Sequence, residues 1–245
     1  IIHTATGEVE RVDAVFPVLH GMNGEDGTIQ GLLTIAGIPF VGCNAEASAV
    51  CMDKAVTNAL ADFYGIPQAK WTAFDRHAYA ADKALLLKTA ADKLGFPIFV
   101  KPANTGSSVG VTKVCSFDEL APACEKAFEF DKKIVLEEGI DGIEIECAVL
   151  GNEEPIASVV GEIVPCNDFY DYDAKYLAGD SELHIPARLP EEKLEAVRAA
   201  AVNAFRSFGC SGLTRVDFFV RRSDGEILLN EPNTIPGFTE ISMYP

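Results

Sequence analysis

Two strand-like runs near the end of the chain, residues 213–220 and 226–231, constrain its fold more than any other feature. Both runs are rich in β-branched, aromatic and aliphatic residues, and only the polar residues 221–225 separate them. Runs of this composition around a short polar segment that contains glycine are typical of a β-hairpin. The sequence therefore predicts two antiparallel strands here, with a register that follows from the length of the loop.

The predicted register brings two acidic residues together. A three-residue loop over 223–225, with its glycine in the left-handed position, would place Arg222 opposite Glu226. The same register places Asp217 opposite Glu231. Carboxylates directly across a ladder repel each other, and neither is cheap to bury without a partner charge. The hairpin therefore predicts an acidic pair that needs a cation.

The residues around this acidic pair suggest which cation it binds. Side chains alternate along a strand, so Arg215 and Asp217 are expected on one face of the sheet. Every second residue from Ile227 to Glu231 is expected to share a single face of the partner strand, and Asn233 follows two residues later. Oxygen ligands from Asp217, Glu231 and Asn233 favour a hard cation, Mg²⁺ or Mn²⁺. The alternative is that Arg215 neutralises both acids as a structural ion pair.

A lysine at the end of a buried strand marks a second candidate site. Residues 96–102 are expected to form this strand, and Lys101 is costly to bury there unless it meets an anion. The loop over 103–111 is rich in glycine and serine, and such a loop offers backbone amides and hydroxyls to phosphate oxygens. The loop carries neither the P-loop nor the dinucleotide-binding fingerprint. Together with the acidic pair, it predicts a site for a phosphate-bearing ligand.

Composition excludes several classes of function. The chain has 245 residues and a net charge of −17, so general affinity for nucleic acid or an anionic membrane surface is not expected. Its seven cysteines are dispersed without a C-x-x-C pair, which favours a reduced cytoplasmic protein. No signal peptide or membrane-spanning run is recognised. Because the chain opens without an initiator methionine and stops just after a loop, it is expected to be a piece of something longer.

The remaining patterns predict an α/β chain. A strand over 12–19, a loop over 20–27, a helix over 28–36 and a strand over 38–41 form a βαβ unit, whose loop is a usual place for a ligand. His20 lies in that loop, although a core or hydrogen-bonding role is the alternative. The further elements expected are helices over 45–64, 79–94, 117–130 and 190–208, and strands over 111–114, 133–138 and 143–150.

Two acidic or aromatic segments are further candidates for binding. Alternation puts Glu144 and Glu146 on one face of the strand over 143–150, where carboxylates could accept hydrogen bonds from ribose hydroxyls. A solvated strand edge is the alternative. Residues 162–185 are the least regular portion of the chain, and a long polar loop of this kind is usually functional or disordered. Its many tyrosines argue against disorder.

Seven segments, taken in order, resemble the D-alanine:D-alanine ligases of the ATP-grasp superfamily, which include D-Ala:D-Ser ligases of the vancomycin-resistance type. They are VFPVLHGMNGEDGTIQG, CMDK, VKPANTGSSVGVTKV, VLEEGIDGIEIECAVLG, DYDAKY, GLTRVDFF and LNEPNTIPGFTEISMYP. The resemblance implies an α/β and α+β protein in which two α+β domains clasp ATP. It implies an amino-terminal Rossmann-like, substrate-binding domain over 1–42, a central ATP-grasp domain over 43–137 and a carboxyl-terminal catalytic domain over 138–245, the first and last of them truncated.

The resemblance also implies roles for individual residues. The ATP-binding positions of the family match Lys54, Lys101, Ser108, Glu137, Glu138, Ile140, Glu144 and Lys175. The catalytic positions match His20, Ser107, Tyr176, Arg215 and Gly237, with Arg215 and the Gly237 amide stabilising the transition state. Substrate-binding positions match Glu25 and Ser242, and the magnesium ligands match Asp217, Glu231 and Asn233. Glu138 departs from the lysine or glutamine of many relatives. A substrate-binding glutamate of the family would precede Ile1.

The activity that the resemblance implies is the ATP-dependent ligation of two D-alanines through a D-alanyl phosphate, for peptidoglycan precursor synthesis. ATP and two Mg²⁺ ions are expected, with Mn²⁺ as a substitute. D-Serine as second substrate stays open, whereas D-lactate is disfavoured because Lys175 and Tyr176 resemble the amine-accepting members. A nucleotide-binding module without turnover is the alternative of another class. The family further implies a cytoplasmic homodimer that binds small molecules.

Overall fold

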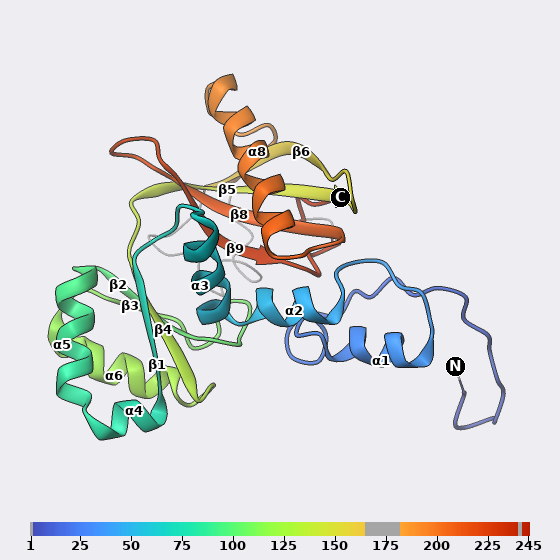
Figure 1. The fold of residues 1–245 in the computed structure, drawn as a ribbon, viewed down its shortest axis with the longest axis horizontal. Coiled ribbons are helices and arrows are strands. Elements are labelled where there is room, and N and C mark those ends of the chain that lie inside the picture. The colour runs from blue at the N-terminus through green and yellow to red at the C-terminus, as the bar shows by residue number, and fades with distance from the viewer. Residues whose placement is uncertain (1, 165–181, 240–241) are drawn as a thin grey trace.

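The structure is a computed structural model that describes residues 2–164, 182–239 and 242–245. Within these ranges the strands form two antiparallel sheets, one of four strands and one of five (Figure 1). Helix α3, Lys54–Tyr64, lies between the sheets, because it contacts both of them. On the smaller sheet it meets β1, Trp71–Asp75, and β4, Lys133–Glu138, and on the larger one it meets the long helix α8, Glu191–Ser207. The two sheets and α3 position the candidate site.

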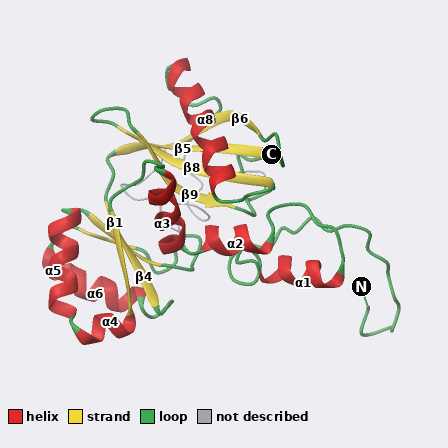
Figure 2. Ribbon diagram, in the orientation of Figure 1, coloured by secondary structure: helices red, strands yellow, loops and turns green. Residues whose placement is uncertain are grey.

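The four-stranded sheet has the strand order β1-β4-β2-β3. Its strands are β1 Trp71–Asp75, β2 Ile98–Pro102, β3 Thr112–Val114 and β4 Lys133–Glu138. Three helices cover one face of it, namely α4 Arg76–Ala81, α5 Lys83–Leu94 and α6 Phe117–Ala127 (Figure 2). Leu87, Ile98, Leu120 and Ile134 are among the residues of the core between these layers. The opposite face carries Lys101 and borders the candidate site.

The five-stranded sheet has the strand order β7-β6-β5-β8-β9. Its strands are β5 Gly142–Gly151, β6 Ile156–Val164, β7 Glu182–His184, β8 Gly212–Arg221 and β9 Ile227–Asn233. Helix α8, Glu191–Ser207, packs against one face through Val197 and Phe205, which meet Val216 and Phe218 in the core. Residues of α2, Ala45–Met52, and of α3 join the same core. The other face of the sheet carries the acidic pair.

Two predicted helices are each divided by an aspartate. The helix predicted over 45–64 is α2 and α3, which meet at Asp53, and the helix predicted over 79–94 is α4 and α5, which meet at Asp82. Each aspartate accepts hydrogen bonds from backbone amides at the start of the next helix. A side-chain cap of this kind satisfies amides that lack a partner in the helix, so it allows the chain to change direction without a glycine or proline.

The amino-terminal segment departs from the prediction. Helix α1, Thr28–Ala36, lies where the sequence placed it. The strands predicted over 12–19 and 38–41 are wrong, since the described residues form a single parallel bridge between Val15 and Phe40. Phe16, Val18 and Leu19 are 46%, 45% and 50% exposed, so the apolar run is not buried as a strand in this structure. The parallel bridge across α1 nonetheless has the connectivity expected of a βαβ unit.

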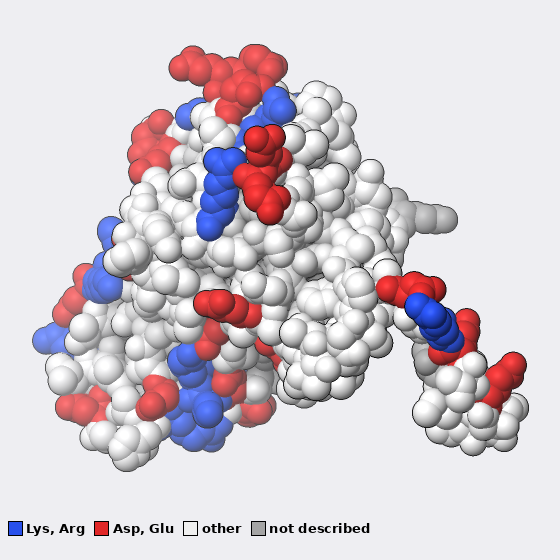
Figure 3. All heavy atoms as spheres, turned by 45° about the vertical axis from the view of Figure 1, so that its right-hand side comes forward, with Lys and Arg blue, Asp and Glu red and all other residues white. Residues whose placement is uncertain are grey.

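The surface carries both signs of charge. On the face shown in Figure 3, lysine and arginine side chains lie next to aspartate and glutamate side chains. The ion pairs of the chain include Lys83 with Glu125, 2.6 Å apart, and Arg198 with Glu195, also 2.6 Å apart. In the part of the chain that the structure describes, no helix combines the length and the apolar character needed to cross a membrane.

Candidate active site

The register of the five-stranded sheet places three carboxylates in one cross-strand row. Glu146 on β5 is the partner of Asp217 on β8, and Asp217 is the partner of Glu231 on β9. Arg215 is likewise the partner of Asn233. Cross-strand partners point to the same face of a sheet, so the acidic pair predicted from the sequence is confirmed in its geometry and gains a third member, Glu146.

The loop and the strand that produce this register differ from the prediction. The Arg221 amide donates to the Glu226 carbonyl, so these two residues close the hairpin and its loop holds four residues instead of three. Arg222 therefore does not face Glu226. A bulge at Asn230 then adds one residue to β9, because Phe218 pairs with Leu229 while Asp217 pairs with Glu231. The two differences cancel at the acidic pair.

The same bulge corrects the predicted faces of β9. Leu229 packs into the core beside Phe218, and Ile227 packs against that core. Glu231 faces the opposite side, with Asp217, so the single face predicted for residues 227–231 is wrong. A bulge changes which side of the sheet the following residues occupy. Because of the bulge, Glu231 lies on the face opposite the core, where its carboxylate faces the site.

Arg215 holds the central acid of the row with two hydrogen bonds. Its Nε donates to Asp217 Oδ1 and its Nη2 donates to Asp217 Oδ2, both at 2.7 Å, and Nε lies 3.2 Å from Glu146 Oε2. Burial alone would lower the pKa of the guanidinium, but the neighbouring carboxylates, Asp217 first, outweigh it and raise the pKa. Arg215 is therefore a permanent, oriented positive charge. Of the ion pair considered as an alternative from the sequence, the part that joins Arg215 to Asp217 is present, and Glu146 is the second acid beside the guanidinium.

The donor chemistry of the row suits a hard cation, although its present geometry is that of an ion pair. Carboxylate and amide oxygens are the ligands that Mg²⁺ prefers, and Asn233 Nδ2 lies 2.9 Å from Asp217 Oδ2, so its amide is already beside the acid. Among the described residues, no group of three or more His, Cys, Asp or Glu side chains is arranged as a metal site. Metal binding by Asp217, Glu231 and Asn233 stays a prediction.

Lys101 points from β2 to a carboxylate of β4. Its Nζ donates to Glu137 Oε2 at 2.6 Å, and Asn58 Nδ2 on α3 donates to the other oxygen of Glu137 at 2.9 Å. Burial would lower the pKa of the Lys101 ammonium, but the charge of Glu137 and the more distant Glu231 raise it overall. A lysine held charged at a buried position is suited to meet a phosphate. The interpretation drawn from its place at the strand end is consistent with this geometry.

Lys54 lies at the start of α3, between the loop and the acidic row. Its Nζ donates to the Thr105 carbonyl at 2.7 Å and lies 3.9 Å from Glu231 Oε2. In the same loop Ser107 and Ser108 have φ angles of 52° and 59°, a left-handed conformation that residues other than glycine rarely adopt. Successive amides in such a conformation can form a concave anion-binding nest. The Lys54 side chain is only 15% exposed, so it is not a solvated surface lysine.

Two cavities meet at these residues. The first, of about 400 Å³, lies between the two sheets, and Lys101, Ser108, Glu137, Glu138 and Ile140 line it. The second, of about 300 Å³, lies over the acidic row, and His20, Glu25, Arg215, Asp217, Asn233, Gly237 and Ser242 line it. Lys54, Ser107, Glu144 and Glu231 line both cavities. A group transferred from one ligand to the other would pass at this shared wall.

The far side of the second cavity is built by two loops. The ring of His20 donates from Nδ1 to the Ile235 carbonyl at 3.1 Å, which joins the loop over 20–27 to the loop after β9. Ser242 Oγ accepts from the Thr239 amide at 3.1 Å, and a Cβ at Gly237 would lie 2.6 Å from that Oγ. Glycine is therefore required at 237 for Ser242 to approach the loop backbone so closely.

Glu25 is an acid whose surroundings favour its neutral form. Burial raises the pKa of its carboxyl, and the hydrogen bond from the Gly21 amide, like the charge of His20, only partly offsets this. Glu231 raises the same pKa further. An ionised carboxylate at this position therefore costs stability, and the cost disappears as the group takes up a proton.

We expect Glu25→Gln to raise the melting temperature at pH 7. A raised folded-state pKa contributes stability that is present below the unfolded value of about 4.3 and is lost as pH rises through the folded pKa. Scanning calorimetry should therefore show the advantage of the glutamine variant at pH 7 shrinking as pH falls to about 4. Glu8→Gln, at an exposed position of the same segment, is the control. A constant difference at every pH would contradict the prediction.

All the predicted site residues that the structure describes line at least one of the two cavities. Lys175 and Tyr176 lie outside the described residues. Asn58 and Phe219 also belong to the site and were not among the candidates, and Glu146, expected only to share a face with Glu144, was not given a role beside Asp217. Their signals were present, because Asn58 is one helical turn after Lys54, and Glu146 and Phe219 alternate with the candidates Glu144 and Asp217 along their strands. The roles assigned to the lining residues stay predictions.

Two family models match the chain. The model described as D-ala D-ala ligase N-terminus matches residues 2–43, and that described as D-ala D-ala ligase C-terminus matches residues 60–245. The chain is 53% identical over 236 residues to the D-alanine–D-alanine ligase of Acetivibrio thermocellus, covering 96% of this chain and 63% of that protein. It is 50% identical over 234 residues to the ligase of Caldicellulosiruptor bescii, covering 96% and 64%. The chain thus spans a little under two thirds of the length of these curated relatives.

Solved structures agree with the sequence matches. The VanG D-Ala:D-Ser ligase from Enterococcus faecalis superimposes with a TM-score of 0.87 at 46% identity, covering 97% of this chain and 68% of that one. The D-alanine-D-alanine ligase from Coxiella burnetii superimposes with a TM-score of 0.84 at 38% identity, covering 98% and 64%. The ATP-grasp fold expected from the sequence is confirmed by these likenesses. By sequence and by structure, the chain belongs to the D-alanine–D-alanine ligase family.

Proposed function

We propose that this chain carries the catalytic site of an ATP-dependent ligase that joins two D-alanines through a D-alanyl phosphate, for peptidoglycan precursor synthesis. The observation that carries the proposal is the wall shared by the two cavities, where Lys54, Ser107 and Glu231 meet. A nucleotide in the first cavity and a small amino acid in the second would meet there. The ligases among the relatives support the same assignment.

The first cavity is the proposed ATP site. Glu137, Glu138, Ile140 and Glu144 lie where they could bind the base and the ribose, while Lys101 and Lys54 would offset charge on the phosphates. In the first step a carboxylate oxygen of D-alanine attacks the γ-phosphorus of ATP, the bond to the β-phosphate oxygen breaks, and ADP leaves. The amides at Ser107 and Ser108 would help to hold the transferring group.

The second cavity is the proposed amino-acid site. Glu25, His20 and Ser242 line it and would bind the ammonium and carboxylate groups of the substrates. In the second step the amine of the acceptor, having lost a proton, attacks the acyl carbon of the D-alanyl phosphate, and inorganic phosphate leaves when the tetrahedral intermediate collapses. Arg215 and the Gly237 amide would stabilise the developing oxyanion. Lys175 and Tyr176 are proposed to close the site against water, which would otherwise hydrolyse the acyl phosphate.

Asp217, Glu231 and Asn233 are the proposed ligands for two Mg²⁺ ions, with Mn²⁺ as a substitute. The carboxylates of Asp217 and Glu231 are cross-strand partners, which supports a shared ion. When bound, the ions would neutralise phosphate charge during transfer. If an ion were bound there, Arg215 would share Asp217 with it, and the contact of Arg215 with Glu146 would still hold the guanidinium in place. The three-domain division over 1–42, 43–137 and 138–245 and a cytoplasmic homodimer belong to the same proposal.

D-Serine is a second candidate acceptor. The structural likeness to a D-Ala:D-Ser ligase, with 46% identity and a TM-score of 0.87, is the observation that favours it. A D-serine side chain differs from that of D-alanine by one hydroxyl, so the overall fold cannot separate the two. The acceptor has to be identified by turnover.

We expect the chain to release ADP from ATP when Mg²⁺ and D-alanine are present. A coupled assay should follow ADP with D-alanine alone and with D-alanine plus D-serine, and mass spectrometry should identify the dipeptide. D-Lactate and L-alanine are the controls, and neither is expected to raise the rate. Nucleotide binding with no ADP release in the presence of any D-amino acid would favour a nucleotide-binding module without turnover and overturn the ligase assignment.

A further inference from the structure

The site face of β6 carries a glycine where a side chain would be expected. Gly161 is the cross-strand partner of Glu146, so both residues point to the face that bears the second cavity. Two residues further along the strand, Ile163 lines both cavities. The φ angle of Gly161 is not positive, so the backbone does not require glycine there. The reason for the glycine must lie in what faces it.

Met243 occupies the space in front of Gly161. A Cβ built at position 161 would lie 2.6 Å from Met243 Sδ and 3.1 Å from its Cε, whereas the next neighbour, Ile185 Cγ1, would be 3.8 Å away. The first distance is shorter than real Cβ contacts, and the last is an ordinary van der Waals contact. The thioether therefore rests on the bare backbone of β6. Met243 also lines the second cavity, so its position affects the volume that is left there.

The backbone around Met243 is fixed on both sides. The Ser242 amide donates to the Thr239 carbonyl at 3.0 Å, and the Tyr244 hydroxyl donates to the Val149 carbonyl on β5 at 3.0 Å. The Tyr244 ring also contacts Phe238, with centroids 5.5 Å apart. Because its two neighbours are tied down, Met243 can respond to a new Cβ on β6 only by moving its flexible side chain.

We propose that Gly161 sets the size of the amino-acid subsite by allowing Met243 to lie back against β6. This inference rests on the proposed function and deepens it, since it names a residue that selects substrates by side-chain size. A Cβ at 161 displaces the thioether from the sheet toward the cavity, where it takes up room needed by the substrate side chain. Substrates with small side chains, such as the methyl group of D-alanine, are those that the unsubstituted site admits.

The test is Gly161→Ala, assayed with D-alanine, D-serine and D-2-aminobutyrate. A loss of space equal to about one methylene is worth on the order of tenfold in kcat/KM. We therefore expect kcat/KM for D-alanine to fall about tenfold and to fall further for the two larger side chains. A merely structural defect would lower the rate for all three substrates by the same factor. An unchanged ratio among them, or a gain for the larger substrates, would overturn the proposal.

Two further variants complete the design. A Met243→Ala background removes the two atoms that a Cβ at 161 would meet first, Sδ and Cε, and the next neighbour, Ile185 Cγ1, is at an ordinary 3.8 Å. Adding Gly161→Ala to Met243→Ala should therefore change no rate by more than about twofold, the margin within which independent sites add. Equal losses in both backgrounds would show that Met243 does not carry the effect. Gly31→Ala is the matched control, because a Cβ there has nothing within 4 Å and the position is helical.

Binding separates this inference from the proposed function. If the unsubstituted chain binds D-alanine but does not turn over, calorimetric titration with the same three D-amino acids replaces kcat/KM. The expected result is the same order of losses in Gly161→Ala and their absence in the Met243→Ala background. If the unsubstituted chain binds none of the three, the second cavity is not an amino-acid site and this inference fails together with the proposed function. If Gly161→Ala loses binding most strongly for the larger D-amino acids although the chain does not turn over, this inference holds while the proposed ligase activity fails.

Discussion

Replacing Arg215 with leucine is expected to destabilise the fold and abolish turnover together. The guanidinium holds both oxygens of Asp217 at 2.7 Å and lies 3.2 Å from Glu146, and the side chains of these acids are only 5% and 11% exposed. Removing one partner of a buried ion pair costs about 3–5 kcal/mol, because a buried charge loses its compensation. Leucine fills a similar space but carries no charge, so the free energy of unfolding should fall by about that amount.

Turnover should fall as well, by a separate mechanism. If Arg215 stabilises the oxyanion, losing it removes on the order of 3 kcal/mol of transition-state stabilisation, or about a hundredfold or more in rate. Arg215→Lys keeps the charge but not the planar fork that contacts two oxygens at once. We therefore expect the lysine variant to recover most of the stability and little of the rate. Urea unfolding and ADP release, measured on the same preparations, would separate the two effects.

Arg221 provides a matched control on the same strand. It also pairs with two acids, Asp224 at 2.7 Å and Glu226, but their side chains are 51% and 45% exposed. Exposed ion pairs contribute little, typically 0 to about 1 kcal/mol. Arg221→Leu should therefore unfold almost as the unsubstituted chain does. Equal losses of stability in the two variants would show that burial of the Arg215 cluster has no energetic consequence.

The acidic pair could be predicted from the sequence because local rules determine which residues face each other across a short hairpin. The prediction of Asp217 opposite Glu231 is confirmed, although both the loop length and the strand were wrong by one residue. The position of the bulge at Asn230 could not be foreseen, because Pro232 in the same strand is compatible with either an edge strand or a bulge. It is favoured by burial, because it keeps Leu229 in the core while Glu231 reaches the site. Tertiary packing decided this detail.

The amino-terminal strand failed for a different physical reason. An apolar run over 12–19 indicates burial, but burial depends on neighbours that a pattern does not supply. In this structure Val15 has one bridging partner, and Phe16 contacts Phe238 with ring centroids 5.2 Å apart. The segment therefore packs against the loop that carries Gly237 instead of forming a regular strand.

The sequence could predict that lysines and acids belong to the site, but it could not predict which group each of them contacts. A lysine at a strand end and a glycine- and serine-rich loop indicated an anion site, and the two lysines do line the first cavity. That Lys101 meets Glu137 and Lys54 meets the Thr105 carbonyl depends on how α3 and the two sheets come together. Contacts between elements distant in sequence have no local signal. The same holds for Gly161, because its proposed role depends on its contact with Met243, which lies more than 80 residues later in the sequence.

Asp217→Asn is expected to lower turnover by on the order of a thousandfold, because a divalent ion on the phosphates supplies several kcal/mol of charge stabilisation. Asparagine has nearly the same shape as aspartate, and Arg215 retains its contact with Glu146, so the chain should remain folded by circular dichroism. The readout that does not depend on activity is Mn²⁺ binding in the presence of a non-hydrolysable ATP analogue, followed by electron paramagnetic resonance. The affinity for the ion should fall at least about tenfold, since a neutral amide replaces a charged ligand.

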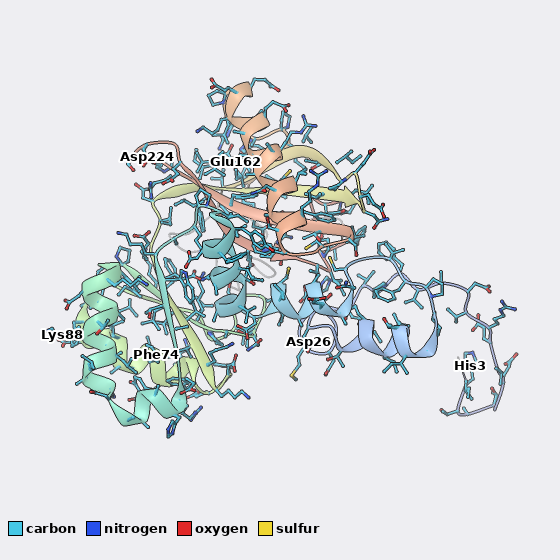
Figure 4. All side chains as sticks on the ribbon, in the orientation of Figure 1. His3, Asp26, Phe74, Lys88, Glu162 and Asp224 are labelled. Atoms are coloured by element: carbon cyan, nitrogen blue, oxygen red, sulfur yellow. The ribbon has the colours of Figure 1, made fainter. Side chains whose placement is uncertain are left out.

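The control for this change lies on the same hairpin. Asp224, at the tip of the β8–β9 hairpin (Figure 4), pairs with Arg221 and is half exposed, so Asp224→Asn makes the same substitution far from the cavities. It should leave both the Mn²⁺ affinity and the rate of ADP release within about twofold, as for surface changes in general. If Asp217→Asn binds Mn²⁺ as tightly as this control, Asp217 is not a metal ligand. If instead it unfolds while its soluble fraction turns over normally, its carboxylate serves only to pair with Arg215.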